Sequence, residues 1–150
     1  MLLVRNLSQI ATPVGTSGVR GAAMRELRIV PDGVIVAGWG RFAYAGGEGE
    51  MRSSIRAAIT TDLDARRATA IPGFVDSHTH IPFAGYRESE FNRRLRGETY
   101  EEIAASGGGT AATVYSTRAA SEEELTANVL RRAATMARYG TTTAEAKSGY

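Results

Sequence analysis

Two histidines, His78 and His80, carry the chemistry that is easiest to read from this sequence, and the chain has no others. Side chains at positions i and i+2 of a β-strand point to the same face of the sheet. A His-x-His pair at the end of a strand can therefore aim two imidazoles, which are ligands for zinc, iron or nickel, at one point. Asp76 shares that face, where its carboxylate could orient a ligand. The spacing predicts part of a metal site; two polar residues at a strand end, without metal, are the alternative.

The elements that must position this pair predict a βαβ unit. An apolar run over 71–80 is typical of a short strand, and capping boxes at Thr99–Glu102 and Ser121–Glu124 predict two helices. Gly140 ends the second helix, and residues 141–147 predict a second strand. Such units form parallel sheets, in which active sites lie at the carboxyl ends of the strands. The apolar face expected for the second helix consists of Leu125, Val129, Leu130, Ala133, Met136 and Ala137.

Residues 1–70 predict a small, sandwich-like β-domain with no chemistry of its own. The apolar start is strand-like, and β-branched residues on both sides of Pro31-Asp32-Gly33 predict a β-hairpin. Residues 52–70 show no clean period, so that a strand pair and a loop both fit. The residues expected in the core of this sheet are Val34, Ile35, Val36 and Trp39.

Length and composition exclude several classes of protein. A complete (β/α)8 barrel needs about 250 residues, so 150 residues can hold only part of one. The absence of cysteine excludes a disulfide scaffold and a thiol nucleophile, and it is compatible with the cytoplasm. With 18 basic and 16 acidic residues and no run of like charges, we expect no nucleic-acid partner. No apolar stretch is long enough to span a membrane, and the N-terminus does not resemble a signal peptide.

Several motifs make the second part of the chain resemble a known family. The run Ile71-Pro-Gly-Phe-Val-Asp-Ser-His-Thr-His80 is similar to the first-strand signature of the metal-dependent amidohydrolase superfamily. Five further motifs resemble one family of this superfamily, the imidazolonepropionases. These motifs are Phe83–Phe91, Gly97–Ile103, Gly107–Gly109, Thr117–Leu125 and Glu145–Tyr150. The resemblance implies an α/β fold. In it a small β-domain (1–70) precedes the first βα units of a TIM-like (β/α)8 hydrolase barrel (71–150), which is truncated.

The resemblance also implies roles for four residues. His78 and His80 match two metal ligands, and Arg87 and Tyr150 match residues that bind the substrate. A guanidinium group can hold a carboxylate through two parallel hydrogen bonds, which suits a substrate with a propanoate tail. The implied cofactor is one zinc or iron ion, and two imidazoles do not choose between these metals. The family's other ligands, a further histidine and an aspartate, and its acid–base residues come from later strands.

The reaction that the resemblance implies belongs to histidine degradation. It is the hydrolysis of 4-imidazolone-5-propanoate to N-formimidoyl-L-glutamate by metal-activated water, in the cytoplasm, by a protein that can form a homodimer at full length. With only two ligands, the chain by itself is expected to be inactive. The alternatives are another cyclic amidohydrolase or aminohydrolase of the superfamily, and a structural fragment without catalysis.

Overall fold

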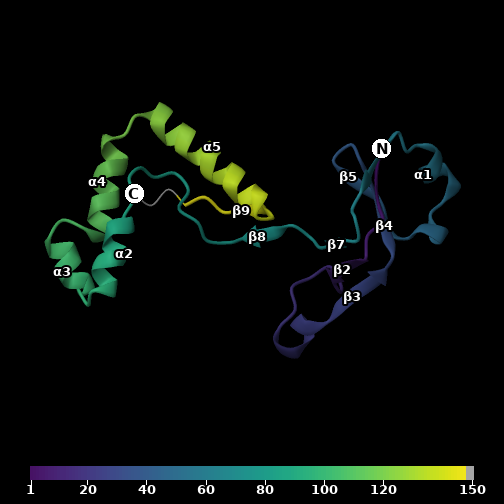
Figure 1. Ribbon diagram of the computed structural model, residues 1–150, viewed down its shortest axis with the longest axis horizontal. Helices are drawn as coiled ribbons and strands as arrows, with labels where there is room; N and C mark the ends of the chain where they lie inside the picture. Colours follow the sequence, from purple (N-terminus) through teal and green to yellow (C-terminus); the bar gives the residue numbers. More distant parts are fainter. Residues whose placement is uncertain (148–150) are drawn as a thin grey trace. The chain divides into compact units, whose positions relative to one another are not determined.

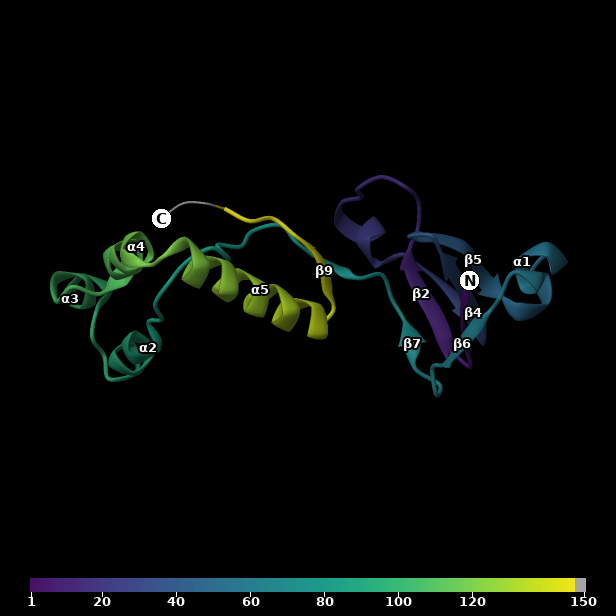
Figure 2. The same cartoon turned by 90° about the horizontal axis from the view of Figure 1, so that it is seen from above.

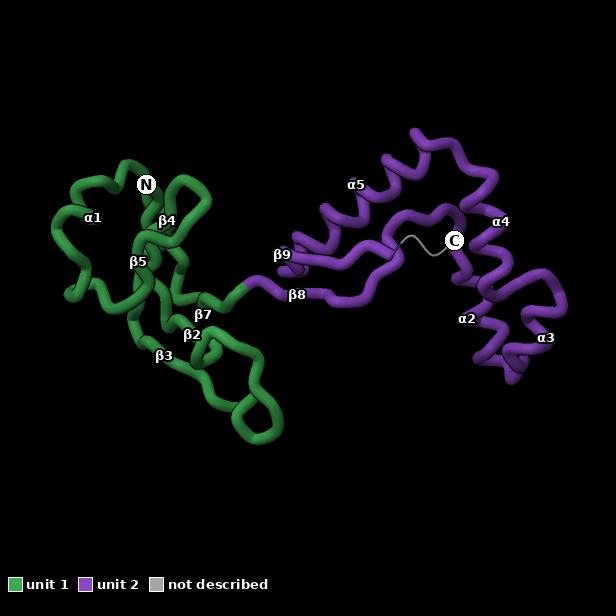
Figure 3. The backbone as a smooth tube through the Cα atoms, turned by 180° about the vertical axis from the view of Figure 1, so that it is seen from behind, with its two compact units in different colours: residues 1–72 green, residues 73–150 purple. Residues whose placement is uncertain are grey.

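The computed structural model describes residues 1–147. Residues 1–72 form one compact unit, drawn in green in Figure 3. This unit contains two β-sheets (Figure 1). One has the strand order β5-β4-β1-β6, with β1 antiparallel to β4 and parallel to β6. The other has the order β3-β2-β7. The strands are β1 (Leu2–Arg5), β2 (Gln9–Pro13), β3 (Leu27–Pro31), β4 (Gly33–Gly38), β5 (Arg41–Gly47), β6 (Thr61–Asp64) and β7 (Thr69–Ala70).

The apolar centre of this first unit lies beneath β4. Val34 and Val36 of β4 are buried together with Met51 and Ile55. Ile55 belongs to the short helix α1 (Ser53–Ala57), which follows two 3-10 turns, η1 (Gly21–Arg25) and η2 (Glu48–Glu50). The segment 52–70, which the sequence left open, thus holds one helical turn and two strands.

The predicted hairpin at Pro31-Asp32-Gly33 is wrong. β3 pairs with β2 and β4 pairs with β1 and β5, so the chain passes from one sheet to the other at Asp32. The Asp32 N–H donates to the Ser8 carbonyl oxygen (3.1 Å), and its φ of 46° gives the sharp change of direction. The true hairpin joins β4 and β5 through Trp39 and Gly40, which both have positive φ, as a tight primed turn requires. Trp39 is 86% exposed there and not in the core.

From Gly73 onward the chain forms a βαβ arrangement. The parallel strands are β8 (Phe74–Asp76) and β9 (Thr141–Ala144), and α5 runs beside them in both views (Figures 1 and 2). The two strands approach closely at Gly73, where a Cβ atom would overlap the side chain of Thr142. The helices between them are α2 (Glu88–Leu95), α3 (Tyr100–Ala105), α4 (Gly109–Ala119) and α5 (Glu122–Arg138).

The capping signals located two of these helices correctly. Thr99 and Glu102 form both hydrogen bonds of a capping box at the start of α3, and Ser121 accepts from the Glu124 N–H at the start of α5. α2 and α4 begin without a side-chain cap, so the sequence carried no start signal for them. The inward face of α5 is also rotated from the prediction: Leu130 is 65% exposed, whereas the residues that turn inward are Leu125, Asn128, Val129, Arg132 and Met136.

The fold class is therefore mixed α/β with several small sheets. Within residues 1–147, no helix is long and apolar enough to cross a bilayer.

Candidate functional site

The two histidines lie just beyond the last residue of β8. The pairing of β8 with β9 continues past both strand ends, because the Lys147 N–H donates to the Thr79 carbonyl oxygen between the histidines (2.9 Å). Asp76 ends the strand, and its carboxylate accepts from the backbone N–H of His78 (3.2 Å). Asp76 thus holds the backbone of His78, and its expected role in orienting a metal ligand stays a prediction.

The imidazole rings of His78 and His80 lie near one another. Their centroids are 5.5 Å apart and their planes are inclined by 53°. Zinc–nitrogen bonds of about 2.0–2.1 Å would place two imidazole centroids on one tetrahedral ion roughly 5 Å apart. The separation therefore fits two ligands of a single metal ion. His78 is exposed and His80 is half-buried, which leaves room for further ligands.

Within residues 1–147, no third metal ligand approaches this pair. The described part of the chain holds no group of three or more His, Asp or Glu side chains that could bind one ion. A catalytic zinc ion usually has three protein ligands and a water molecule. The pair fits a metal as part of a donor set.

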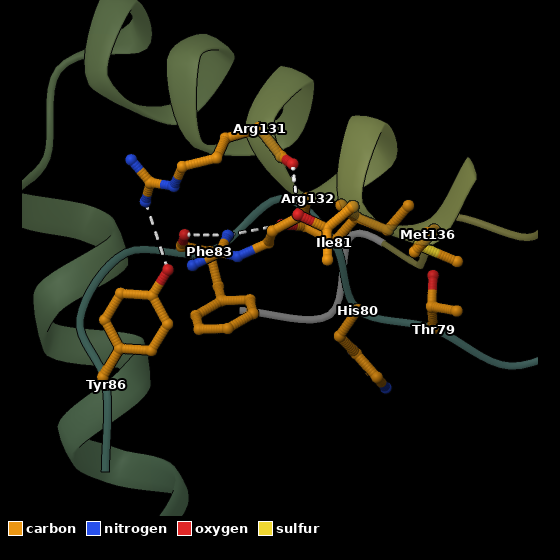
Figure 4. Close-up of a pocket in the computed structure, with 9 residues that line it drawn as sticks. Thr79, His80, Ile81, Phe83, Tyr86, Arg131, Arg132 and Met136 are labelled. Carbon is orange, nitrogen blue, oxygen red and sulfur yellow. Dashed lines mark hydrogen bonds between the residues drawn. The ribbon is translucent and has the colours of Figure 1, made fainter. Parts of the chain in front are cut away.

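A cavity of about 510 Å³ adjoins His80 (Figure 4). One side is the segment that follows the histidine pair, and the other is the inward face of α5. The lining is mostly apolar, with two arginines, and consists of Thr79, His80, Ile81, Phe83, Tyr86, Arg131, Arg132, Thr135 and Met136.

Arg132 connects the two sides of this cavity. Its Nη1 donates to the carbonyl oxygens of Ile81 (2.7 Å) and Phe83 (2.6 Å). Its guanidinium carbon lies 3.5 Å from the centre of the Phe83 ring, a cation–π contact. Sequence reasoning missed Arg132, because a helical arginine among other arginines carries no signal that its partners are two distant carbonyl groups.

Arg131, the neighbour of Arg132, contacts different groups. Its Nη2 donates to the Tyr86 hydroxyl (3.1 Å) and to Asn128 Oδ1 (2.7 Å). The hydrogen bond from Arg131 is the main cause that lowers the pKa of the Tyr86 hydroxyl, because a donor stabilises the phenolate.

Arg87 lies immediately before α2, on a second cavity of about 250 Å³. This cavity shares Phe83 and Tyr86 with the first one, so Arg87 and His80 line adjoining cavities. Arg87 Nη1 is 3.6 Å from Glu90 Oε2, and 38% of its side chain is exposed. Part of the guanidinium group is therefore held by a carboxylate and part is open to a ligand.

Glu90 is a buried charge that sequence reasoning also missed. Its Oε1 accepts from the Gly109 N–H at the start of α4 (2.8 Å), while Oε2 faces Arg87. A Cβ atom on Gly108 would lie 2.8 Å from that same Oε1, so the glycine turn leaves room for the carboxylate. Tyr150, the fourth predicted site residue, lies outside the described residues.

Comparisons with known proteins give a consistent set of relatives. No family model matches the chain. It is 46% identical over 149 residues to imidazolonepropionase of Myxococcus xanthus and 45% identical over 150 residues to that of Symbiobacterium thermophilum. Each alignment covers 99% of this chain but only 35% of the relative, so the chain spans about a third of the length of these proteins.

Two solved structures share the fold at low sequence identity. The crystal structure of A. niger ochratoxinase matches with a TM-score of 0.60 and 13% identity, over 99% of this chain and 26% of that one. E. coli guanine deaminase matches with a TM-score of 0.50 and 20% identity, over 97% of this chain and 31% of that one. The solved structures show a shared fold alone, and by sequence the chain is similar over nearly its whole length to about a third of these imidazolonepropionases.

Proposed function

We propose that this chain is the part of an imidazolonepropionase that supplies two metal ligands and the arginine for the substrate carboxylate. The reaction is the hydrolysis of the cyclic amide of 4-imidazolone-5-propanoate, a step of histidine degradation. In this proposal, residues 1–70 belong to a small β-domain and residues 71–150 open a (β/α)8 barrel.

The observation that carries the proposal is the placement of the histidine pair. The two imidazoles follow a strand of a parallel pair, at the spacing of two ligands on one ion. His80 lines a cavity that adjoins the cavity of Arg87. In (β/α)8 enzymes, catalytic residues lie at the carboxyl ends of the strands, which is where this pair stands.

His78 and His80 would hold a zinc or iron ion, and the chemistry that such an ion supplies is a water molecule acidic enough to give hydroxide near neutral pH. Arg87 binds the propanoate carboxylate with the part of its guanidinium group that Glu90 leaves open. Fixing that tail orients the ring toward the histidines. Phe83 and Tyr86, shared by the two cavities, form an aromatic wall beside the substrate.

The experiment is a chimera. This chain replaces the matched third of the Myxococcus xanthus imidazolonepropionase, and consumption of imidazolonepropanoate is followed by ultraviolet absorbance. We expect activity in the chimera and none in the isolated chain, because two imidazoles are only half of a four-coordinate site.

Two variants of the chimera separate the roles. Arg87→Ala is expected to raise KM by about 10–100-fold, the value of a charge-assisted hydrogen bond to a carboxylate. His78→Ala is expected to abolish activity together with bound metal. A well-folded chimera that binds metal but hydrolyses only other cyclic amides, or whose KM ignores Arg87, would reject imidazolonepropanoate as the substrate.

A further inference from the structure

The histidine pair and the residues after it, up to Phe83, follow the end of β8, so groups outside that strand must fix their backbone. β8 ends at Asp76 and Thr79 still pairs with Lys147, so within the described part of the chain residues 80–83 run beyond the regular sheet. Backbone without a regular partner costs entropy to order, and a pair of metal ligands binds more weakly when the ligands must first be immobilised. A device that fixes this segment would therefore strengthen the metal site.

We infer that Arg132 is a positioning residue for the histidine pair, which it holds by clamping the backbone of residues 81–83 to α5. This inference rests on the proposed metal-binding role of His78 and His80. The clamp consists of the two hydrogen bonds from Nη1 to the Ile81 and Phe83 carbonyl oxygens, and of the contact with the Phe83 ring. The first of these carbonyl groups belongs to the residue directly after His80.

The surroundings of Arg132 fit the role of a backbone clamp. The side chain is half-buried, and its Nη1 already serves two acceptors. Its place on the inward face of α5, next to Met136, puts a charged group where the helix would otherwise present an apolar one. The carbonyl dipoles of residues 81 and 83 and the face of the Phe83 ring stabilise the charge there. Figure 4 shows the hydrogen bonds to the carbonyl oxygens as dashed lines.

The direction in which metal affinity changes when Arg132 is removed separates a positioning role from a purely electrostatic one. A guanidinium ion repels a metal ion, so if only its charge mattered, removing Arg132 would tighten metal binding. If Arg132 holds the ligand segment, its removal weakens metal binding. Arg131→Met is the matched control, since it removes the same charge from the same helix but leaves the carbonyl groups of residues 81 and 83 bonded.

The test is a titration of the 150-residue chain with zinc chloride, observed through the ring protons of its two histidines by NMR. His78→Ala assigns the two sets of signals. We expect Arg132→Met to weaken zinc binding about fivefold, the cost of immobilising one freed segment. Arg131→Met should bind as the parent does or slightly more tightly. Equal or tighter binding by Arg132→Met, with helical content retained by circular dichroism, would overturn the inference.

Arg132→Lys keeps the test decisive should the methionine variant fail to fold. Lysine retains the charge but has a shorter reach and no planar group to lie over Phe83, so we expect weaker zinc binding than in the parent. Parent-like binding by Arg132→Lys would count against the clamp.

A parent chain that takes up no zinc would show that the pair does not hold the ion by itself, and it would leave the clamp testable. The clamp then predicts larger fast motions of residues 78–83 by 15N relaxation in Arg132→Met than in Arg131→Met. Unchanged relaxation would end the inference as well.

Discussion

At the scale of single residues, the groups that the sequence could predict are those whose chemistry is carried by their own spacing. His78 and His80 are two positions apart and the only histidines, and their rings lie close together although both follow the end of β8. Glu90 and Arg132 act through a backbone N–H and two carbonyl groups that lie 19 to 51 positions away. Every residue has such groups, so no pattern of side chains announces these contacts.

A residue-scale prediction concerns the ion pair of Arg93 and Glu98. Arg93 Nε donates to Glu98 Oε2 (2.7 Å), and this hydrogen bond is the main cause that lowers the pKa of Glu98. A carboxyl group whose pKa is lower in the folded state adds stability above its unfolded pKa of about 4.3 and loses it as pH falls through the folded value.

We therefore expect Glu98→Gln to have a lower free energy of unfolding than the parent at pH 7. Below pH 4, where Glu98 of the parent becomes protonated, this ion pair no longer distinguishes the two proteins. The difference between variant and parent should shrink as the pH falls, measured by urea unfolding at both pH values. The effect is small because the pair is about a third exposed. A difference that grows toward low pH would contradict the assignment.

At the scale of elements, the helices with capping residues and the parallel pair β8–β9 were predictable, and the strand partners within residues 1–72 were not. Thr99 and Ser121 act within three residues of themselves, so local sequence suffices. The Pro31-Asp32-Gly33 turn has the composition of a hairpin, yet long-range pairing with β1 and β2 places its two strands in different sheets. Turn composition gives the change of direction but not the partner of each strand.

An element-scale prediction tests the close approach of β8 and β9. Gly73→Ala would put its Cβ within 3 Å of three Thr142 side-chain atoms, including Thr142 Cβ, so the strands must separate. We expect a loss of about 1–3 kcal/mol in the free energy of unfolding, the usual cost of overpacking, measured by urea unfolding.

The double variant Gly73→Ala/Thr142→Gly removes the clash and serves as the control. In the Thr142→Gly background, Gly73→Ala should lower the free energy of unfolding by less than it does in the parent. Additive effects of the two substitutions would show that the strands do not approach as closely as described.

At the scale of the whole chain, much apolar surface of the βαβ part is uncovered. Val75, at the centre of β8, is 70% exposed, Phe74 is 55% exposed and Leu130 of α5 is 65% exposed. Strands of a parallel sheet are usually buried on both faces, whereas these side chains form apolar surface that the described residues leave uncovered. This agrees with a match to only a third of each relative.

The exposed strand predicts that the isolated chain binds hydrophobic dyes and self-associates. Val75→Thr has a similar shape and a more polar surface, so we expect weaker fluorescence of the dye ANS and a smaller sedimentation coefficient at high concentration. Ala119→Ser, on an exposed helical site, is the control and should change neither. Parent-like behaviour of Val75→Thr would place the adhesive surface elsewhere.

The contact of Arg132 with residues 81 and 83 also bears on the order of events during synthesis. The arginine is 51 and 49 positions after its two acceptors, so it leaves the ribosome long after the histidines. Until then the nascent chain lacks this clamp, because the long intervening segment must close before the clamp forms. If the histidine pair binds a metal ion as proposed, it would reach its full affinity for that ion only after α5 has docked on residues 81–83.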